Sequence, residues 1–184
     1  MKAIVLDRDG VINEDSDDYI KTADEWQPIA GSLEAIARLH SAGYVVAVAT
    51  NQSGLSRGYF DEYDLANIHQ KMLALVEERG GVIDGIFYCP HGPGEGCGCR
   101  KPATGLLSQI ETELDLQLEQ AYFVGDSRKD LEAAIAFRMQ PILVRTGKGR
   151  QTEQALLAEP LPGVSIFDDL QTAVDKLILD DNAG

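Results

Sequence analysis

Residues 3–10 read Ala-Ile-Val-Leu-Asp-Arg-Asp-Gly, so four apolar residues lead directly into two aspartates and a glycine. An unbroken apolar run of this kind is typical of a strand buried on both faces. Strand alternation then places Asp7 and Asp9 on the same side. Two carboxylates at the end of a strand are costly unless something positive binds there. A polar strand exit that turns at Gly10 explains the same letters, so this stretch alone leaves both interpretations open.

Further apolar runs follow, with helical patterns between them. The runs are Tyr44–Ala49, Ile83–Tyr88, Ala121–Val124, Ile142–Val144 and a weaker Val164–Phe167. The helical patterns are Ser32–Ala42, Asp61–Arg79, Thr104–Leu114, Lys129–Phe137 and Leu170–Leu179. This alternation predicts an α/β fold with one doubly wound, Rossmann-like, mostly parallel sheet and helices on both faces. We expect one domain over residues 1–179, Ser32 as the first N-cap, and a frayed tail over 180–184.

The composition is globular and strongly acidic. Of the 184 residues 44% are hydrophobic and 25% charged, and the formal net charge is −14. Such a chain binds nucleic acid poorly and is not drawn to anionic membranes, and an anionic substrate would need local cations or a metal. No run of 18 apolar residues exists, and the apolar start is too short for a signal peptide. We therefore expect a cytoplasmic monomer without nucleic-acid or membrane partners.

Three later segments carry side chains of the kind that bind phosphate or magnesium. They are Thr50-Asn51-Gln52-Ser53-Gly54, Arg100-Lys101-Pro102 and Gly125-Asp126-Ser127-Arg128-Lys129-Asp130. An arginine fork beside a lysine point charge suits phosphate, and an aspartate at a strand end suits Mg²⁺. Each segment also has an ordinary interpretation, namely an Asx-type turn, a solvated basic pair and a helix N-cap, respectively.

All three cysteines fall within the short segment Cys89-Pro-His91-Gly-Pro-Gly-Glu-Gly-Cys97-Gly-Cys99. An odd, clustered set is a poor disulfide framework and a better metal site. Three thiolates and one imidazole would complete a closed, structural zinc site; free cysteines in a flexible loop are the alternative. The loop ends just before Arg100, so zinc would fix the position of the basic pair. His40 and His69 lie within predicted helices and are expected to be surface or partly packed residues rather than ligands.

The acidic pair, Thr-Asn, Lys-Pro and Gly-Asp occur in this order, and together they resemble the haloacid dehalogenase phosphatase superfamily over about the whole chain. The resemblance implies that Asp7 attacks phosphorus and forms an aspartyl-phosphate. Asp9 would protonate the leaving oxygen and then activate water. Mg²⁺ would be held by the Asp7 carboxylate, the Asp9 backbone carbonyl and Asp126.

The same resemblance implies that Thr50 and Lys101 hold the phosphoryl oxygens. Asp130 would stand behind them and orient Lys101 or a metal-bound water. Only 42 residues separate Asp7 from Thr50, and 50 separate Thr50 from Lys101. Once a helix and a strand are assigned, neither gap can hold a cap domain, so we expect an open site walled by loops.

Within the superfamily, two enzyme families share the outline DRDGVIN, TNQSG-x-x-RG, CPH, CRKP and GD. One comprises the D-glycero-D-manno-heptose 1,7-bisphosphate 7-phosphatases, which serve ADP-heptose and lipopolysaccharide core biosynthesis. The other comprises the histidinol-phosphate phosphatases, which often form half of a bifunctional enzyme. No dehydratase half follows, which favours the heptose family as an expectation. Either way, the implied partner is a small phosphorylated metabolite.

Loops around Asp15–Tyr19 and Ser53–Arg57, together with the cysteine loop, are expected to contact the substrate. The resemblance implies that Arg100 contacts the sugar or its second phosphate. The heptose family commonly has a lysine directly after Asp126, where this chain has Ser127 followed by two cations. The predicted substrate-binding residues are Arg8, Asp15, Asp18, Tyr19, Asn51, Gln52, Ser53, Arg57, Arg100, Ser127 and Arg128.

Two other classes fit part of the pattern. A receiver-like signalling module also places an acidic cluster, a threonine and a lysine on a doubly wound sheet. It needs no acid two residues after its phosphorylated aspartate, so Asp9 counts against it. A zinc-ribbon interaction module would explain the cysteines alone, and it predicts that Asp7 is dispensable.

Overall fold

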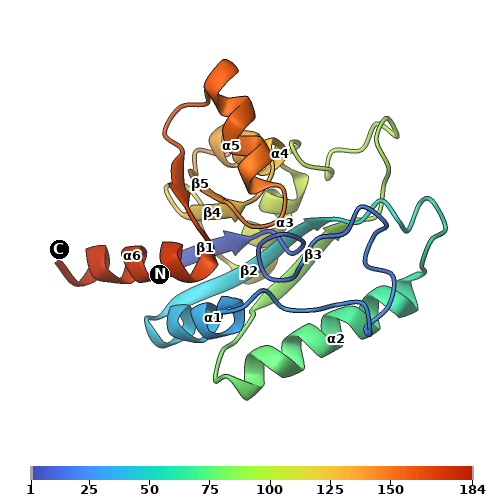
Figure 1. Ribbon diagram of the computed structural model, residues 1–184, viewed down its shortest axis with the longest axis horizontal. Coiled ribbons are helices and arrows are strands. Elements are labelled where there is room, and N and C mark those ends of the chain that lie inside the picture. The colour runs from blue at the N-terminus through green and yellow to red at the C-terminus, as the bar shows by residue number, and fades with distance from the viewer. Residues whose placement is uncertain (1, 184) are drawn as a thin grey trace.

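The computed structural model describes residues 2–183 and contains, over that range, one sheet of six strands (Figure 1). The strands are β1 (Lys2–Leu6), β2 (Tyr44–Asn51), β3 (Gly85–Cys89), β4 (Tyr122–Gly125), β5 (Gln140–Val144) and β6 (Ser165–Phe167). Their order is β3-β2-β1-β4-β5-β6, and every pairing is parallel. The direction of winding reverses between β1 and β4. This is the topological switch point at which doubly wound sheets bind ligands.

Helices cover both faces of this sheet. One face carries α1 (Ser32–Ser41), α2 (Glu62–Glu78) and α6 (Leu170–Ala183); the other carries α3 (Gly105–Leu114), α4 (Arg128–Ala136) and α5 (Gly149–Ala158) (Figure 1). Strand residues alternate between the two layers: Ile4 and Leu6 pack with the first group of helices, Ala3 and Val5 with the second. Because both faces are buried, the strands need continuous apolar runs, which is why the sequence predicts them well.

Two helix starts differ from the sequence prediction. Ser32 is the first residue of α1 rather than its N-cap, because its hydroxyl donates to the carbonyl oxygen of Ile12 at 2.7 Å. Gly31 precedes the helix with a φ of 82°, which glycine adopts without strain. The sequence patterns do not predict α5, because the apolar pattern of this helix is weak: only Gly149 and Thr152 of it are buried.

The last helix, α6, is longer than predicted. The expected helix ends at Leu179 and is followed by a frayed segment, whereas α6 continues to Ala183. Asp181 explains the extension, since it accepts a hydrogen bond from the Tyr44 hydroxyl at 2.6 Å and pairs with Lys2 at 2.9 Å. These contacts tie the last helical turn to the amino-terminal ends of β1 and β2.

The segments that follow β1 and β3 form loops rather than a further domain. Residues 7–31 contain only isolated bridges, which join Asn13 to Asp9 and to Pro28. Residues 90–104 form the cysteine loop. Over residues 2–183 the chain therefore has no cap above the sheet, as the spacing predicts. In the same range no helix has both the length and the apolarity that a membrane span requires.

Candidate active site

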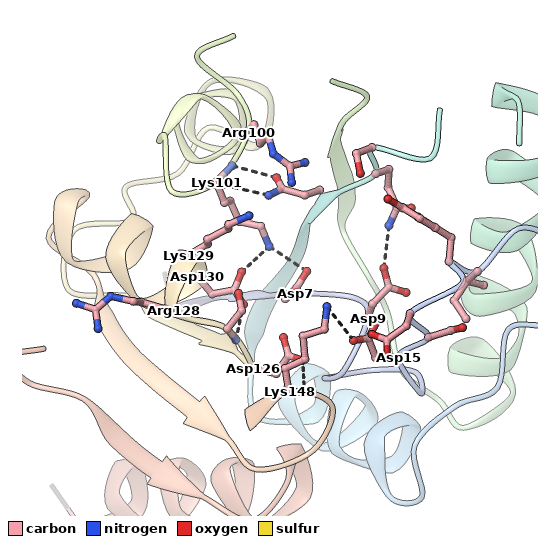
Figure 2. A pocket seen from close by; sticks show the side chains of 18 residues that line it. Asp7, Asp9, Asp15, Arg100, Lys101, Asp126, Arg128, Lys129, Asp130 and Lys148 are labelled. Atoms are coloured by element: carbon pink, nitrogen blue, oxygen red, sulfur yellow. Dashed lines mark hydrogen bonds and ion pairs between the residues drawn. The ribbon is translucent and has the colours of Figure 1, made fainter. Parts of the chain in front are cut away.

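The carboxyl ends of β1 and β4 bring four acidic side chains to one edge of the sheet (Figure 2). Asp7 and Asp9 follow β1, Asp126 follows β4, and Asp130 lies in the first turn of α4. The Asp7 amide donates to the carbonyl oxygen of Val124 at 2.9 Å, which continues the pairing of the two strands. One carboxylate oxygen from each of Asp7, Asp126 and Asp130 lies within 4.8 Å of the others.

Lys101 is the buried cation that joins two of these carboxylates. Its Nζ donates to Asp7 Oδ1 at 2.9 Å and to Asp130 Oδ1 at 2.6 Å (Figure 2). It also donates to the carbonyl oxygen of Ala49 at 2.8 Å. These three acceptors match the three protons of an ammonium group. Burial alone lowers the pKa of Lys101, but Asp130 and Asp7 outweigh it and raise that pKa above its ordinary value. Lys101 is therefore a fixed positive charge beside Asp7.

Two predicted site residues turn out to position Lys101 and its partner. Asn51, predicted to bind substrate, accepts from the Lys101 amide at 3.0 Å and donates to the Lys101 carbonyl at 3.1 Å. Asp130 Oδ2 accepts from the amide and the hydroxyl of Ser127 at 3.1 and 2.9 Å. Ser127, also predicted to bind substrate, is thus occupied as the N-cap residue of α4. Asp130, predicted to orient Lys101 or a metal-bound water, thus contacts Ser127 through one oxygen and Lys101 through the other.

Asp7 stands among like charges. Its Oδ1 accepts from Lys101 and from the Arg8 amide at 2.8 Å, while its Oδ2 has no hydrogen-bond partner among residues 2–183. Burial, followed by repulsion from Asp130, raises the pKa of Asp7 well above its ordinary range despite Lys101. The same two causes raise the pKa of Asp126 to about 7. An oxygen-liganded divalent cation suits this donor set, because it would offset the repulsion.

Asp9 has the opposite surroundings. Nη2 of Arg8 donates to Asp9 Oδ1 at 2.9 Å, Asn13 Nδ2 donates to the same oxygen at 2.9 Å, and Gln52 Nε2 donates to Oδ2 at 3.0 Å. Burial favours a higher pKa for Asp9, but Arg8, followed by Asn13 and Gln52, outweighs burial and lowers that pKa. Gln52 also donates to the Thr50 hydroxyl at 2.9 Å, so it links Thr50 with Asp9.

Arg8 departs most from the sequence prediction. We predicted that it contacts substrate, but its side chain is completely buried. The guanidinium lies between Asp9 and His69, whose Nε2 is 3.1 Å from Arg8 Nη1. An arginine beside two aspartates in sequence suggests a phosphate contact; its burial against α2 depends on tertiary packing that the motif does not encode.

A cleft of about 450 Å³ opens at this edge of the sheet. The predicted substrate residues that line it are Asp15, Tyr19, Asn51, Gln52, Ser53, Arg100, Ser127 and Arg128. Besides the buried Arg8, three of the predicted catalytic or substrate-binding residues lie outside its lining. Asp18 and Arg57 are exposed on their loops, and Thr50 is buried behind Gln52. The ring of Tyr19 packs against that of Tyr59 at 5.2 Å between centroids, so two loops meet at the rim.

The two cations after Ser127 behave differently. Arg128 points away from Asp7 (Figure 2). Its Nε and Nη1 donate to Glu132 Oε1 at 2.7 Å and to the Glu159 carbonyl at 2.9 Å. Lys129 lines the cleft, and burial together with the nearby charge of Arg100 lowers its pKa. Both side chains line the cleft, but only that of Arg128 is engaged by Glu132 and Glu159.

Lys148 lines the cleft as well, although the sequence analysis did not single it out. Its amide donates to Asp126 Oδ2 at 2.8 Å, and its Nζ lies 3.6 Å from Asp15 Oδ2. The available signal was a lysine between two glycines just past the β5 strand end. Gly10 and Gly147 close around Asp126, since a Cβ on either would collide with its Oδ2.

The cysteine loop gathers its four predicted ligands. Sγ of Cys89 lies 3.7 Å from that of Cys97 and 3.1 Å from that of Cys99, and His91 Nδ1 lies 3.3 Å from Cys99 Sγ. Tetrahedral zinc with Zn–S bonds of about 2.3 Å holds its ligands at roughly this spacing. Burial, followed by the contact with Cys99, raises the pKa of Cys89 to about 12, whereas a backbone hydrogen bond with Arg100 lowers the pKa of Cys97 to about 7. A bound cation would therefore be needed to keep Cys89 ionised. The donor set therefore suits a closed zinc site.

Comparisons with known proteins agree with this geometry. The HAD-hydrolase-like family model matches residues 98–173. The D-glycero-beta-D-manno-heptose-1,7-bisphosphate 7-phosphatase of Pseudomonas aeruginosa is 56% identical over 95% of this chain and 97% of its own length. The Pseudomonas putida protein of that name is 54% identical over 97% of this chain and 100% of its own.

A solved structure is similar over nearly the same range. It is the D,D-heptose 1,7-bisphosphate phosphatase of B. bronchiseptica complexed with magnesium and phosphate, with a TM-score of 0.92 and 47% identity. The match covers 98% of this chain and 99% of that one. The chain therefore belongs to the D-glycero-β-D-manno-heptose-1,7-bisphosphate 7-phosphatase family of the haloacid dehalogenase-like hydrolases.

Proposed function

We propose that this protein is a magnesium-dependent phosphatase that removes the 7-phosphate of D-glycero-β-D-manno-heptose 1,7-bisphosphate. Relatives of that name, at 56% and 54% identity along almost the whole chain, support the substrate. One structural observation carries the chemistry: Asp7 stands at the switch point, its Oδ1 hydrogen-bonded to the buried Lys101 and its Oδ2 without a hydrogen-bond partner within the described range 2–183. The enzyme would act as a cytoplasmic monomer in ADP-heptose and lipopolysaccharide core biosynthesis.

In the first step the Asp7 carboxylate attacks phosphorus, and the bond between phosphorus and the sugar oxygen breaks. That oxygen takes a proton from the Asp9 carboxyl group, and Asp7 becomes an acyl phosphate. Asp9 is ionised in the substrate-free geometry, because Arg8, Asn13 and Gln52 lower its pKa. The negative charge of a bound phosphate raises this pKa again, so Asp9 acquires its proton as the substrate binds.

In the second step the Asp9 carboxylate takes a proton from water as the water oxygen attacks phosphorus. The bond between phosphorus and the Asp7 oxygen breaks, which releases inorganic phosphate and restores the Asp7 carboxylate. The three donors around Asp9 favour its ionised form, which is the form this step needs. Covalent catalysis divides one difficult displacement into two.

The acidic edge supplies oxygen donors for Mg²⁺, and Asp7, Asp126 and the Asp9 carbonyl would hold it. When bound, Mg²⁺ neutralises negative charge between the phosphate and the carboxylates. Lys101, with its charge fixed by Asp130, stabilises the phosphoryl oxygens electrostatically. The Thr50 hydroxyl accepts from Gln52, which leaves its own proton to donate to the phosphoryl group.

The remote end of the substrate would be recognised by the walls of the cleft. Arg100, Lys129 and Lys148 supply positive charge suited to a second phosphate, and Asp15 is an acceptor suited to a sugar hydroxyl. The four cysteine-loop ligands would hold a structural zinc ion. Arg100 follows this loop directly and donates to the His91 carbonyl at 3.2 Å, so the loop sets its position.

Initial rates of phosphate release at fixed Mg²⁺ test the proposal. We expect kcat/KM for the heptose bisphosphate to exceed that for histidinol phosphate by about tenfold or more, because polar groups built for one substrate stay unpaired with the other. A preference of that size for histidinol phosphate would contradict the substrate assignment. If release stopped at one equivalent per chain, the receiver-like signalling module would be favoured instead.

A further inference from the structure

A buried pair of side chains lies behind Asp9, and the proposed mechanism gives one of them no role. His69, in the middle of α2, places Nε2 3.1 Å from Nη1 of Arg8. Arg8 is fully buried and His69 is 8% exposed. The other edge of the guanidinium faces Asp9: its Nε and Nη2 lie 3.2 and 2.9 Å from Asp9 Oδ1. His69, Arg8 and Asp9 thus form a chain of contacts from α2 to the cleft.

The chemistry of the contact fixes the state of His69. A guanidinium group can only donate hydrogen bonds, so His69 Nε2 must accept and the ring proton must be on Nδ1. A doubly protonated ring would turn an N–H group toward the N–H group of Arg8. Burial, followed by the charge of Arg8, lowers the pKa of His69 to about 3. The imidazole is therefore a neutral acceptor at any pH near neutrality.

We propose that His69 is a positioning residue that holds the Arg8 guanidinium against Asp9 and thereby fixes the carboxylate that exchanges protons in the reaction. The inference rests on the function proposed above. The donors of Arg8 divide between the two partners, with Nη1 assigned to His69 and the other two nitrogens to Asp9. Without His69, a buried donor would have no acceptor, and the guanidinium would rotate to find one.

The helix itself makes His69 a firm support. Ile68 and Met72 flank it on α2 and are completely buried in the core that packs against β1 and β2. The imidazole also packs beside the ring of Tyr88 in β3, with 6.2 Å between ring centroids. The sheet and the long helix α2 therefore hold Asp9 in place through His69 and Arg8, in addition to the turn in which Asp9 lies.

Substrates with different leaving groups can distinguish a positioning role of His69 from a purely structural one. A sugar alkoxide needs a proton from Asp9 as it leaves, whereas p-nitrophenolate leaves readily without one. A positioning defect should therefore slow phosphoryl transfer from a sugar phosphate much more than from p-nitrophenyl phosphate. A general loss of folded structure or of metal would slow both alike.

The experiment measures release of the leaving group in single turnovers, with enzyme in excess and Mg²⁺ saturating. His69→Leu removes the acceptor, and His69→Gln keeps one at a similar reach. Met72→Leu is the matched control, since it alters a buried residue of the same helix that has no polar contact with Arg8. Circular dichroism and thermal unfolding establish that each variant is folded.

We expect His69→Leu to slow the sugar phosphate about tenfold to a hundredfold and p-nitrophenyl phosphate less than about threefold, because only part of the proton-transfer contribution is lost. His69→Gln should restore the sugar-phosphate rate to within about threefold of wild type, since it keeps the acceptor. Met72→Leu should leave the ratio of the two rates unchanged.

Equal slowing of both substrates by folded His69→Leu, no slowing of either, or no rescue by His69→Gln would overturn the proposal. If His69→Leu does not fold, Arg8→Lys replaces it, because lysine keeps the charge but not the fork. The same split between substrates is then expected, and an equal loss would overturn the idea. Failure of the proposed function is distinct, since wild-type enzyme would then release the sugar poorly or not at all before any substitution is made.

Discussion

Asp7 and Asp9 are two positions apart, yet the groups around them on the two sides of the cleft shift their pKa values in opposite directions. Asp7 faces Asp130 and other carboxylates, and burial together with their repulsion raises its pKa. Asp9 faces Arg8, Asn13 and Gln52, and these donors lower its pKa. Two carboxyl groups of the same kind differ in pKa only because different groups contact them. The neighbouring side chains therefore determine which aspartate acts as nucleophile and which exchanges protons.

The two sides are also built differently. The Asp7 side is made by the sheet, where β1 and β4 end together and Lys101 reaches in from the loop before α3. The Asp9 side is made by a tight turn, in which the Gly10 amide donates to the Asn13 carbonyl at 2.7 Å, with Arg8 and α2 behind it. Changes on one side should therefore leave signatures that changes on the other do not.

The largest effect is expected from Asp7→Asn, which removes the nucleophile. Turnover should fall by at least about 10⁴-fold, as it does when other covalent nucleophiles are removed. The metal-free variant should be at least as stable as wild type, because one of several repelling carboxylates has gone. Phosphate release and thermal unfolding in EDTA measure the two effects. Full activity would favour the zinc-ribbon interaction module.

Asp9→Asn should cost less, about 10²–10⁴-fold in kcat for the sugar phosphate, since it removes acid and base catalysis but leaves the nucleophile. Mg²⁺ affinity should change little, because only the Asp9 backbone would bind the metal. Steady-state kinetics across a Mg²⁺ titration measure both quantities. A loss of activity as large as that of Asp7→Asn, together with weakened Mg²⁺ binding, would contradict the assignment of different roles to the Asp7 and Asp9 side chains.

Cys97→Ser tests whether the cysteine loop supports the Lys101 side of the cleft. The Gly105 amide donates to the Gly98 carbonyl at 2.9 Å, so the loop is tied to the start of α3. We expect zinc content to fall and the free energy of unfolding to drop by about 2 kcal/mol or more, as loss of a structural metal site does. Elemental analysis and urea unfolding measure these changes, with Glu95→Gln in the same loop as control. Unchanged zinc stoichiometry would refute the site.

The smallest effect concerns pH. The folded-state pKa of Asp126 is about 7, above the unfolded value of about 3.9, so its stabilising contribution is full below the unfolded pKa and is lost as pH rises through about 7. Asp9, whose pKa is lowered, contributes stability above its unfolded pKa and loses it as pH falls.

Mg²⁺ binds the ionised carboxylates, so it should stabilise the protein more at pH 8 than at pH 5. Each kcal/mol of that difference corresponds to about 2–4 °C in Tm for a chain of this size. Thermal unfolding with Mg²⁺ or EDTA at the two pH values measures it, and Asp126→Asn should reduce the difference to the part that comes from the raised pKa of Asp7. Equal Mg²⁺ shifts at both pH values would contradict the raised pKa.

The sequence predicts which residues reach the edge of the sheet, because buried strands need continuous apolar runs and their ends are marked by polar residues. It does not predict how individual polar atoms pair. Asn51 and Lys101 are far apart in the sequence, so their paired hydrogen bonds depend on the packing of β2 against the loop before α3. The burial of Arg8 is missed for the same reason, since a motif gives a residue's place along the chain but not the direction of its side chain.

Rapid-quench trapping of the covalent intermediate directly tests whether Asp7 is the nucleophile that becomes phosphorylated. Enzyme mixed with phosphate-labelled substrate is quenched in acid within the first turnover, and the labelled peptide is located by mass spectrometry. We expect to find phosphate on the Asp7 carboxyl group. This acyl phosphate should live longer in Asp9→Asn and should be absent in Asp7→Asn. Phosphate release by wild-type enzyme with no label on Asp7, or with label on another residue, would contradict it.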